Sequence, residues 1–323
     1  MNQAACRNAQ ELPQRRLTGR QREAGVAYAL MSPWVIGFLA LTLLPMAASL
    51  VLSFTDYQLL SPGSARWIGG ANYAEAARDQ AVRQSLKVTA YYAMAEVGLS
   101  LVLGLVLALL LNAGMRGIAT LRTIYYLPAV VSGVSVAILW LWIFQPSGGL
   151  ANHILNLLGL PSVGWIYSSR WVIPAFVLMG LWGVGQTAFI YLAVLQRIPT
   201  NLYEAAAVDG IGPLRRLFGI TLPLVTPALL VNLVLGLIGN FQIFTAGFVI
   251  TTGRGGPGAL TLGGPGQSSL FYVLYLYQNA FTQFRFGYAS ALAWVLFALL
   301  LALTLLIFRS SRRWVYEEGR RFD

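Results

Sequence analysis

Six long apolar runs dominate the sequence and limit the structures that it can form. They span residues 32–54, 88–112, 123–144, 171–195, 225–250 and 288–308. A helix needs about 20 predominantly apolar residues to cross a bilayer, and every run reaches that length. Lipid offers the backbone no hydrogen-bond partners, and no run alternates like a membrane β-strand. The sequence therefore predicts an all-α, polytopic membrane protein with six transmembrane helices.

The composition agrees with this class, since 57% of the residues are hydrophobic and only 10% are charged. Soluble domains carry roughly 25% charged residues. The run at 32–54 follows a long polar leader and exceeds the 7–15 apolar residues typical of a signal peptide. We therefore expect a retained first transmembrane helix at 32–54, although Ala47, Ala48 and Ser49 weakly resemble a cleavage site.

Basic residues are distributed unevenly between the two sides that six spans would create. Fifteen of the 22 Lys and Arg residues lie before the first run, between the second and third, between the fourth and fifth, and after the sixth. The positive-inside rule then predicts a membrane protein with both termini in the cytoplasm. The expected segments are a cytoplasmic tail at 1–31, the helix at 32–54, an extracytoplasmic loop at 55–87, a transmembrane core at 88–308 and a cytoplasmic tail at 309–323. Because topology accounts for most of the net charge of +11, a nucleic-acid partner is not expected.

Several chemistries lack the residues that they need. The chain has one cysteine, Cys6, and one histidine, His153, so it cannot form a Cys/His metal cluster. Its one lysine, Lys87, follows no glycine-rich phosphate loop. His153 lies in a short apolar segment with no acidic neighbour, and we interpret it as solvated or structural. We predict no catalytic residue, no metal site and no cofactor bound by this chain.

The cytoplasmic loop at 199–224 is the most informative segment. Asn201 followed by Glu204 has the spacing of a capping box, and Gly210 is a typical helix stop. These signals predict a two-turn helix over 202–209. A bend at Gly212 and a second short helix follow, and Pro223 marks the entry to the next span. The residues alone leave two readings open, a capped turn or a surface for another protein.

The order of residues in this loop resembles a known family. Glu-Ala-Ala, then Gly six residues after the Glu, then Ile-x-Leu-Pro, is similar to the EAA loop of type I ABC importer permeases. In that family the loop is a coupling helix that docks on the ATP-hydrolysing subunit. The resemblance implies that the coupling contact is formed by Glu204, Ala205, Ala206, Asp209, Gly210, Leu222 and Pro223.

Further segments extend the resemblance over most of residues 72–308, namely 72–73, 104–112, 122–128, 255–257 and 286–289. They look like the first permease subunit of maltose-type and glycerol-phosphate-type carbohydrate importers of the bacterial inner membrane. One departure is a Gly-Gly-Pro sequence that occurs twice, at 255–257 and 263–265. The resemblance implies a type I ABC transmembrane domain, a second permease subunit, an ATP-binding dimer that holds ATP and magnesium, and an extracytoplasmic solute-binding protein.

Polar and aromatic residues inside the fourth and fifth runs are candidates for the solute pathway, because amides and flat apolar rings suit a sugar. Glu96 in the second run would be costly in lipid without a partner, so it forms either a buried pairing or part of the pathway. Hydrogen bonding between helices is the alternative for the amides. For Gly180, Gly183, Gly236 and Gly239 we predict close packing of helices rather than approach of a ligand. The pathway candidates are Trp182, Gln186, Tyr191, Asn232, Asn240, Phe241, Gln242 and Phe244.

The expected function is therefore that of a membrane-spanning subunit of a binding-protein-dependent ABC importer for a sugar or sugar derivative. One alternative is an importer of a non-sugar solute. Others are an ion-coupled secondary transporter, which would need repeated halves and midplane charges, and a membrane-embedded enzyme, which would need clustered acid–base residues. The sequence does not identify the sugar, nor does it show whether this subunit contacts it.

Overall fold

The computed structural model describes residues 19–316 except 61, 62, 64, 115 and 254–262. The described residues form helices and no strand, with one isolated bridge between Thr55 and Trp67. Thus the expectation of an all-helical membrane fold is confirmed. The chain divides into two units, residues 1–51 and 52–323. Part of the segment between the fifth and sixth apolar runs, including the first Gly-Gly-Pro at 255–257, lies outside the described residues.

The described part of the first unit is one predominantly apolar helical segment. It consists of α1 (Gly19–Phe38), a π-helical turn η1 (Leu39–Leu43) and α2 (Leu44–Leu52). Residues Glu23–Leu52 are long and apolar enough to cross a membrane, and an 18-residue window within them has a mean hydropathy of 2.3. The helix thus begins well before the predicted start at residue 32.

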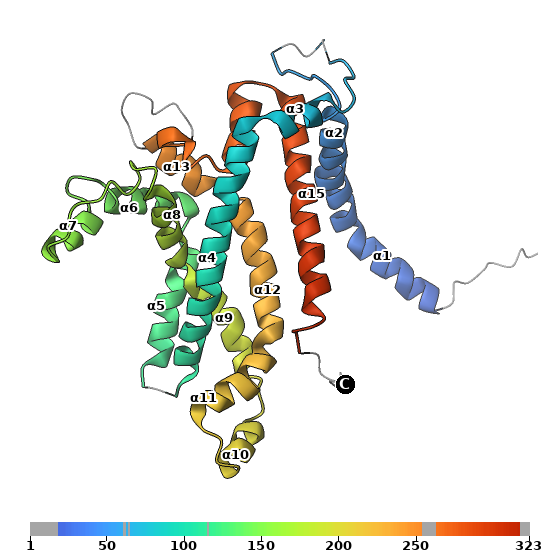
Figure 1. Cartoon of the computed structure of the whole chain (residues 1–323). Coiled ribbons are helices and arrows are strands. Elements are labelled where there is room, and N and C mark those ends of the chain that lie inside the picture. Colours follow the sequence, from blue (N-terminus) through green and yellow to red (C-terminus); the bar gives the residue numbers. More distant parts are fainter. Residues whose placement is uncertain (1–18, 61–62, 64, 115, 254–262, 317–323) are drawn as a thin grey trace, which may run out of the picture. The chain divides into compact units, whose positions relative to one another are not determined.

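The second unit contains three further candidate spans, Gln80–Asn112, Pro213–Gly253 and Phe286–Ser311, and residues 242–244 interrupt the helix within the second of these (Figure 1). In chain order, its elements are α3 (Ala71–Arg78), α4 (Gln80–Asn112), α5 (Ile118–Val130), α6 (Gly133–Ile143), α7 (Leu150–Leu157), α8 (Val172–Leu181), α9 (Val184–Leu195), α10 (Thr200–Val208), α11 (Pro213–Arg216), η3 (Leu217–Thr221), α12 (Leu222–Phe241), α13 (Thr245–Gly253), η4 (Pro265–Gln267), α14 (Tyr272–Tyr277), η5 (Gln278–Thr282) and α15 (Phe286–Ser311).

Two of the predicted spans are broken. Helices α8 and α9 bend by 42°, and α5 and α6 bend by 99°. The prediction of one straight helix at 123–144 is therefore wrong. Val131 and Ser132 adopt extended backbone angles between α5 and α6, and Pro128 removes a backbone donor in the last turn of α5.

Helix α4 is the central element of the second unit. Its 33 residues correspond to a length of about 50 Å. It packs most extensively against α9 and α12. Gly104 permits the contact with α9, because a Cβ atom there would lie 2.7 Å from Thr187 Cγ2. Buried apolar side chains surround this helix in three clusters, centred on Phe176 and Phe271, on Leu292, and on Leu192.

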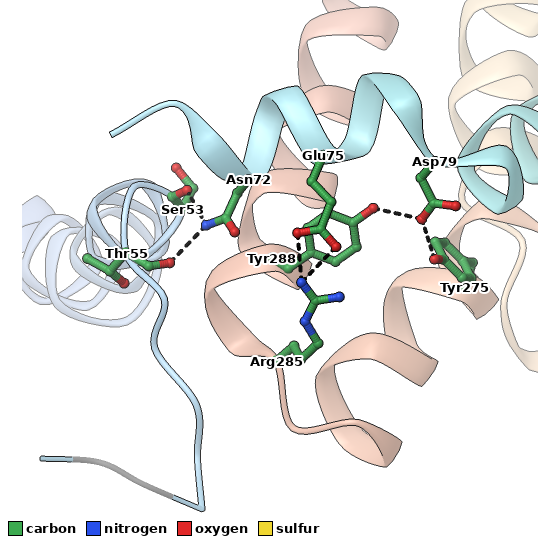
Figure 2. A network of polar contacts seen from close by, with 8 residues as sticks. All are labelled: Ser53, Thr55, Asn72, Glu75, Asp79, Tyr275, Arg285 and Tyr288. Carbon is green, nitrogen blue, oxygen red and sulfur yellow. Dashed lines mark hydrogen bonds and ion pairs between the residues drawn. The ribbon is translucent and has the colours of Figure 1, made fainter. Parts of the chain in front are cut away.

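A polar network fixes the N-terminal end of α4, next to Gln80 (Figure 2). Asp79 caps α4 by accepting from the Ala81 amide at 2.8 Å, and it also accepts from the hydroxyls of Tyr275 at 2.5 Å and Tyr288 at 2.8 Å. Burial alone would raise the pKa of Asp79, but these hydrogen bonds outweigh it and hold the pKa below its ordinary value. Nearby, Asn72 donates to the carbonyls of Ser53 and Thr55. Helix α3 is thereby tied to α14, α15 and the segment that follows α2.

Candidate functional site

A polar cavity of about 320 Å³ lies between α4, α9, α12 and the junction of α8 with α9. Glu96 is its one carboxylate and is only 8% exposed. Asn240 of α12 donates to Glu96 Oε2 at 2.6 Å and also to the Gly236 carbonyl at 2.9 Å. The carboxyl group of α4 is therefore held by an amide from a helix 144 residues further along the chain.

A second polar set lies one turn along α4. Ser100 and Thr187 hydroxyls are 3.1 Å apart, and Asn232 donates to the Thr187 carbonyl at 3.3 Å. Gln186 of α9 also lines the cavity. Because Glu96 and Ser100 are four residues apart, they lie on the same face of α4. The cavity is thus lined by one carboxyl group and one hydroxyl from this face of α4, together with three amides and one hydroxyl from α9 and α12.

Glycines bring the helices close enough to form this cavity. A Cβ atom on Gly180 would lie 2.8 Å from Glu96 Cγ, and one on Gly236 would lie 3.3 Å from Val97 Cγ2. Both positions need the absence of a side chain for α8 and α12 to approach α4. Close packing, which we predicted for these glycines, therefore occurs directly beside the cavity.

The structure brings together three of the eight predicted pathway residues, Gln186, Asn232 and Asn240. The other five lie outside the cavity lining. Tyr191 and Phe241 are buried in apolar clusters, Trp182 meets the edge of Trp140, Phe244 packs on Phe248 and Tyr277, and Gln242 is exposed.

Ser100 and Thr187 were not predicted as pathway residues from the sequence, and two roles remained open for Glu96. Hydroxyl residues are common in membrane helices, so their types gave no signal. The spacing of Glu96 and Ser100 was the available clue, since a carboxylate and a hydroxyl on one helical face suggest a shared polar environment.

The loop predicted for coupling lies at the end of the second unit opposite α3, where Figure 1 shows α10 and α11 next to the start of α12. Helix α10 begins at Thr200, with Pro199 as its N-cap and no side-chain cap. The predicted capping box is therefore wrong, because Asn201 already lies inside the helix. Gly210 is confirmed as the stop, since it has a φ of 71° and the Ile211 amide donates back to the Ala206 carbonyl at 2.9 Å.

The exposed face of α10 and the following turn is partly apolar. Glu204, Ala205, Asp209 and Gly210 are exposed, whereas Ala206 is buried. Val208 is 89% exposed, and Leu214 and Phe218 are 71% and 65% exposed. The predicted second short helix is not separate, because α11 passes through η3 into α12, with Leu222 and Pro223 in its first turn.

A side-chain contact joins α10 to the helical turn η3, which continues into α12. The Tyr203 hydroxyl lies 3.0 Å from Thr221 Oγ1, and Thr221 is buried in the π-helical turn η3. Such turns in α-helices frequently occur at functional sites. This contact connects the exposed surface of α10 to the start of α12, which also lines the cavity.

Similarity to known proteins shows the family of the chain. Residues 100–316 match the family described as binding-protein-dependent transport system inner membrane components. The chain belongs to this family. The permease is 41% identical to the probable ABC transporter permease protein YesP of Bacillus subtilis, over 91% of this chain and 92% of the relative.

A second relative of the permease is the sulfoquinovosyl glycerol transport system permease protein SmoG of Agrobacterium fabrum. It is 33% identical over 89% of this chain and 90% of the relative. A chain in the crystal structure of a bacterial alginate ABC transporter, in complex with an alginate pentasaccharide-bound periplasmic protein, superposes with a TM-score of 0.77. That match covers 90% of the permease and 96% of the other chain at 24% identity, and it shows a shared fold.

Proposed function

We propose that this permease is one of two membrane-spanning subunits of an ABC importer that carries a sugar or sugar derivative into the bacterial cell. The observation that carries the proposal is the cavity beside α4, where a carboxyl, amides and hydroxyls face one another inside a helical membrane component of a transport system. Sugars present many hydroxyl groups, and such a surface can exchange hydrogen bonds with them. Relatives that are named as sugar-type transport permeases support the same solute class.

The cytoplasmic side would be the end that carries α10. Basic residues gather at this end of the helices, as the positive-inside rule requires of cytoplasmic loops. The exposed Val208, Leu214 and Phe218 form an apolar surface that a partner protein can cover, with Glu204 beside it. We assign this surface to a partner ATP-binding subunit, which would hold ATP and magnesium.

Coupling would then follow a physical chain from α10 to the cavity. Closure of the ATP-binding dimer would move α10, and the contact of Tyr203 with Thr221 would pass that movement to α12. Since Asn232 and Asn240 of α12 line the cavity, a shift of α12 would change access to it. A second permease subunit would complete the pathway, and an extracytoplasmic binding protein would deliver the solute at the opposite end.

The test is the ATPase activity of the co-purified complex in lipid, with its solute-binding protein and a panel of sugars. We expect one sugar-loaded binding protein to raise hydrolysis and Glu204→Lys to abolish that stimulation. Glu318→Lys is the matched control, since it makes the same change of charge in the predicted cytoplasmic tail and should retain stimulation. If no ATPase co-purifies and uptake follows a proton or sodium gradient, the importer assignment is wrong. If only non-sugar solutes stimulate hydrolysis, the solute class is wrong.

A further inference from the structure

The cavity beside α4 contains an acidic group without a basic counterpart. Glu96 is the one ionisable residue among those that line it. The three helices that face Glu96, α8, α9 and α12, contain no Lys, Arg or His in their sequences. On α4 itself, the exposed Lys87 lies nine residues before Glu96, which corresponds to about 13 Å along the helix. None of the described residues that line this cavity therefore offers a bound solute a positive charge.

Glu96 is also fixed in position. Asn240 holds its Oε2 at 2.6 Å, and Gly180 packs against the rest of the side chain, since a Cβ atom there would lie 2.8 Å from Glu96 Cγ and 3.3 Å from Oε1. Within the described part of the chain, no hydrogen bond reaches Oε1 of Glu96. This oxygen is consequently available to accept a hydrogen bond from a solute in the cavity, while the neighbouring amides and hydroxyls can both donate and accept.

An anionic solute would meet an unfavourable field in this cavity. A carboxylate or sulfonate would lose its hydration and would lie near Glu96 with no cation to offset the repulsion. Like charges a few ångströms apart interact more strongly inside a protein than in water, because the effective dielectric constant is lower. An uncharged sugar avoids this repulsion, and its hydroxyls can donate to Glu96.

Family membership does not settle the charge of the solute. The relative SmoG is named for sulfoquinovosyl glycerol, a sulfonated and hence anionic sugar derivative. The charge of the solute must therefore be argued from the residues of the individual transporter. In this chain, Glu96 is the ionisable residue that lines the cavity.

We propose that Glu96 makes the pathway selective against anions and that the imported solute is a sugar without an anionic group. The inference rests on the proposed function, since it assumes that the solute passes through this cavity. It assigns Glu96 as a specificity-determining residue that accepts a hydrogen bond from a sugar hydroxyl and repels carboxylate, sulfonate and phosphate groups.

The test must exclude the selectivity of the solute-binding protein. The complex of both permease subunits with the ATP-binding dimer is placed in lipid nanodiscs without that protein, and weak binding is measured by saturation-transfer NMR. The probes are matched in shape: glucose with glucuronic acid, galactose with galacturonic acid, and galactobiose with digalacturonic acid. Glucosamine adds a cationic probe.

We expect the wild type to bind at least one neutral sugar roughly tenfold more tightly than its acid. Glu96→Gln should reduce this ratio to about twofold or less, because the acid gains affinity, whereas Glu96→Asp keeps the charge and should keep the preference. Gln186→Lys adds a cation to the cavity and should favour the acids, so it tests the same field if Glu96→Gln does not assemble.

Two results would overturn the proposal: acids that bind the wild type as well as neutral sugars do, or no saturation transfer from any saccharide. Glucosamine should bind the wild type at least as tightly as glucose, because Glu96 attracts its ammonium group, and it should lose this advantage in Glu96→Gln. The ATPase stimulation and its loss in Glu204→Lys are measured on the same preparation. If those hold while charge discrimination is absent, the charge proposal fails and the importer assignment stands.

Discussion

Arg285 uses a single nitrogen, Nη2, to hold both carboxylate oxygens of Glu75 at 2.8 Å (Figure 2). The pair joins α3 to the residue that precedes α15, 210 positions later in the chain. The guanidinium group also lies 4.6 Å from the centre of the Tyr288 ring, whose hydroxyl donates to Asp79. Glu75 and Asp79, four positions apart in the chain, therefore connect α3 to α14 and α15.

The two acidic residues should contribute unequally to stability. The Arg285 and Glu75 side chains are 37% and 46% exposed, and exposed ion pairs contribute about 0–1 kcal/mol. Asp79 is half-buried, caps α4 and accepts from two tyrosine hydroxyls, so Asp79→Ala should cost roughly 2–4 kcal/mol. Thermal denaturation of the detergent-solubilised complex would measure both changes. A larger loss in Glu75→Gln than in Asp79→Ala would contradict this ranking.

The contribution of Asp79 should also depend on pH. Its pKa in the folded protein is below the ordinary value of 3.8, so its contribution is fully present above that value and is lost as the pH falls through the lowered pKa. We expect the difference in Tm between wild type and Asp79→Ala to be constant from about pH 8 to 5 and to shrink below about pH 4. A difference that grows on acidification would show that the ionised form is not the stabilising one.

A glycine on α9 permits the closest approach of α5. A Cβ atom on Gly185 would overlap the carbonyl group of Tyr125, which is backbone and cannot rotate away. We expect Gly185→Ala to cost at least about 1–3 kcal/mol and to lower the yield of folded permease. Gly98→Ala is the matched control, because Gly98 is also in a helix but has no atom within 4 Å of such a Cβ. Equal yields of the two variants, measured by fluorescence-detected size exclusion, would refute the overlap.

The parts of the fold that sequence could predict are those governed by local physics. The apolar runs had to become membrane helices because of their length, and Gly210 ends α10 because a positive φ suits glycine. The break at Val131 and Ser132 was not predicted, because the apolar run continues on both sides of it, although Pro128 and the Ser132-Gly133 pair both favour a break. Asn201 matched a capping box by type, yet the helix began before it.

The cavity required tertiary information. Asn240 was chosen for its polarity, but its pairing with Glu96 depends on how α12 crosses α4, which periodicity does not specify. Aromatic residues were chosen for their affinity for sugars, and Tyr191 and Phe241 instead fill apolar clusters. Residue type therefore indicated the polar chemistry of the cavity better than it indicated which side chains line it.

The contact between Tyr203 and Thr221 provides a test of coupling that leaves the exposed surface of α10 unchanged. Tyr203→Phe and Thr221→Val each remove one hydroxyl from a pair 3.0 Å apart, at a cost of about 1 kcal/mol to the link. We expect each variant to keep basal ATP hydrolysis in the assembled complex and to lose severalfold of its stimulation by the loaded binding protein. The double variant should lose no more than either single one, because all three remove the same hydrogen bond. Additive losses would mean that the two residues act separately, and unchanged stimulation would mean that movement of α10 reaches α12 through the backbone alone.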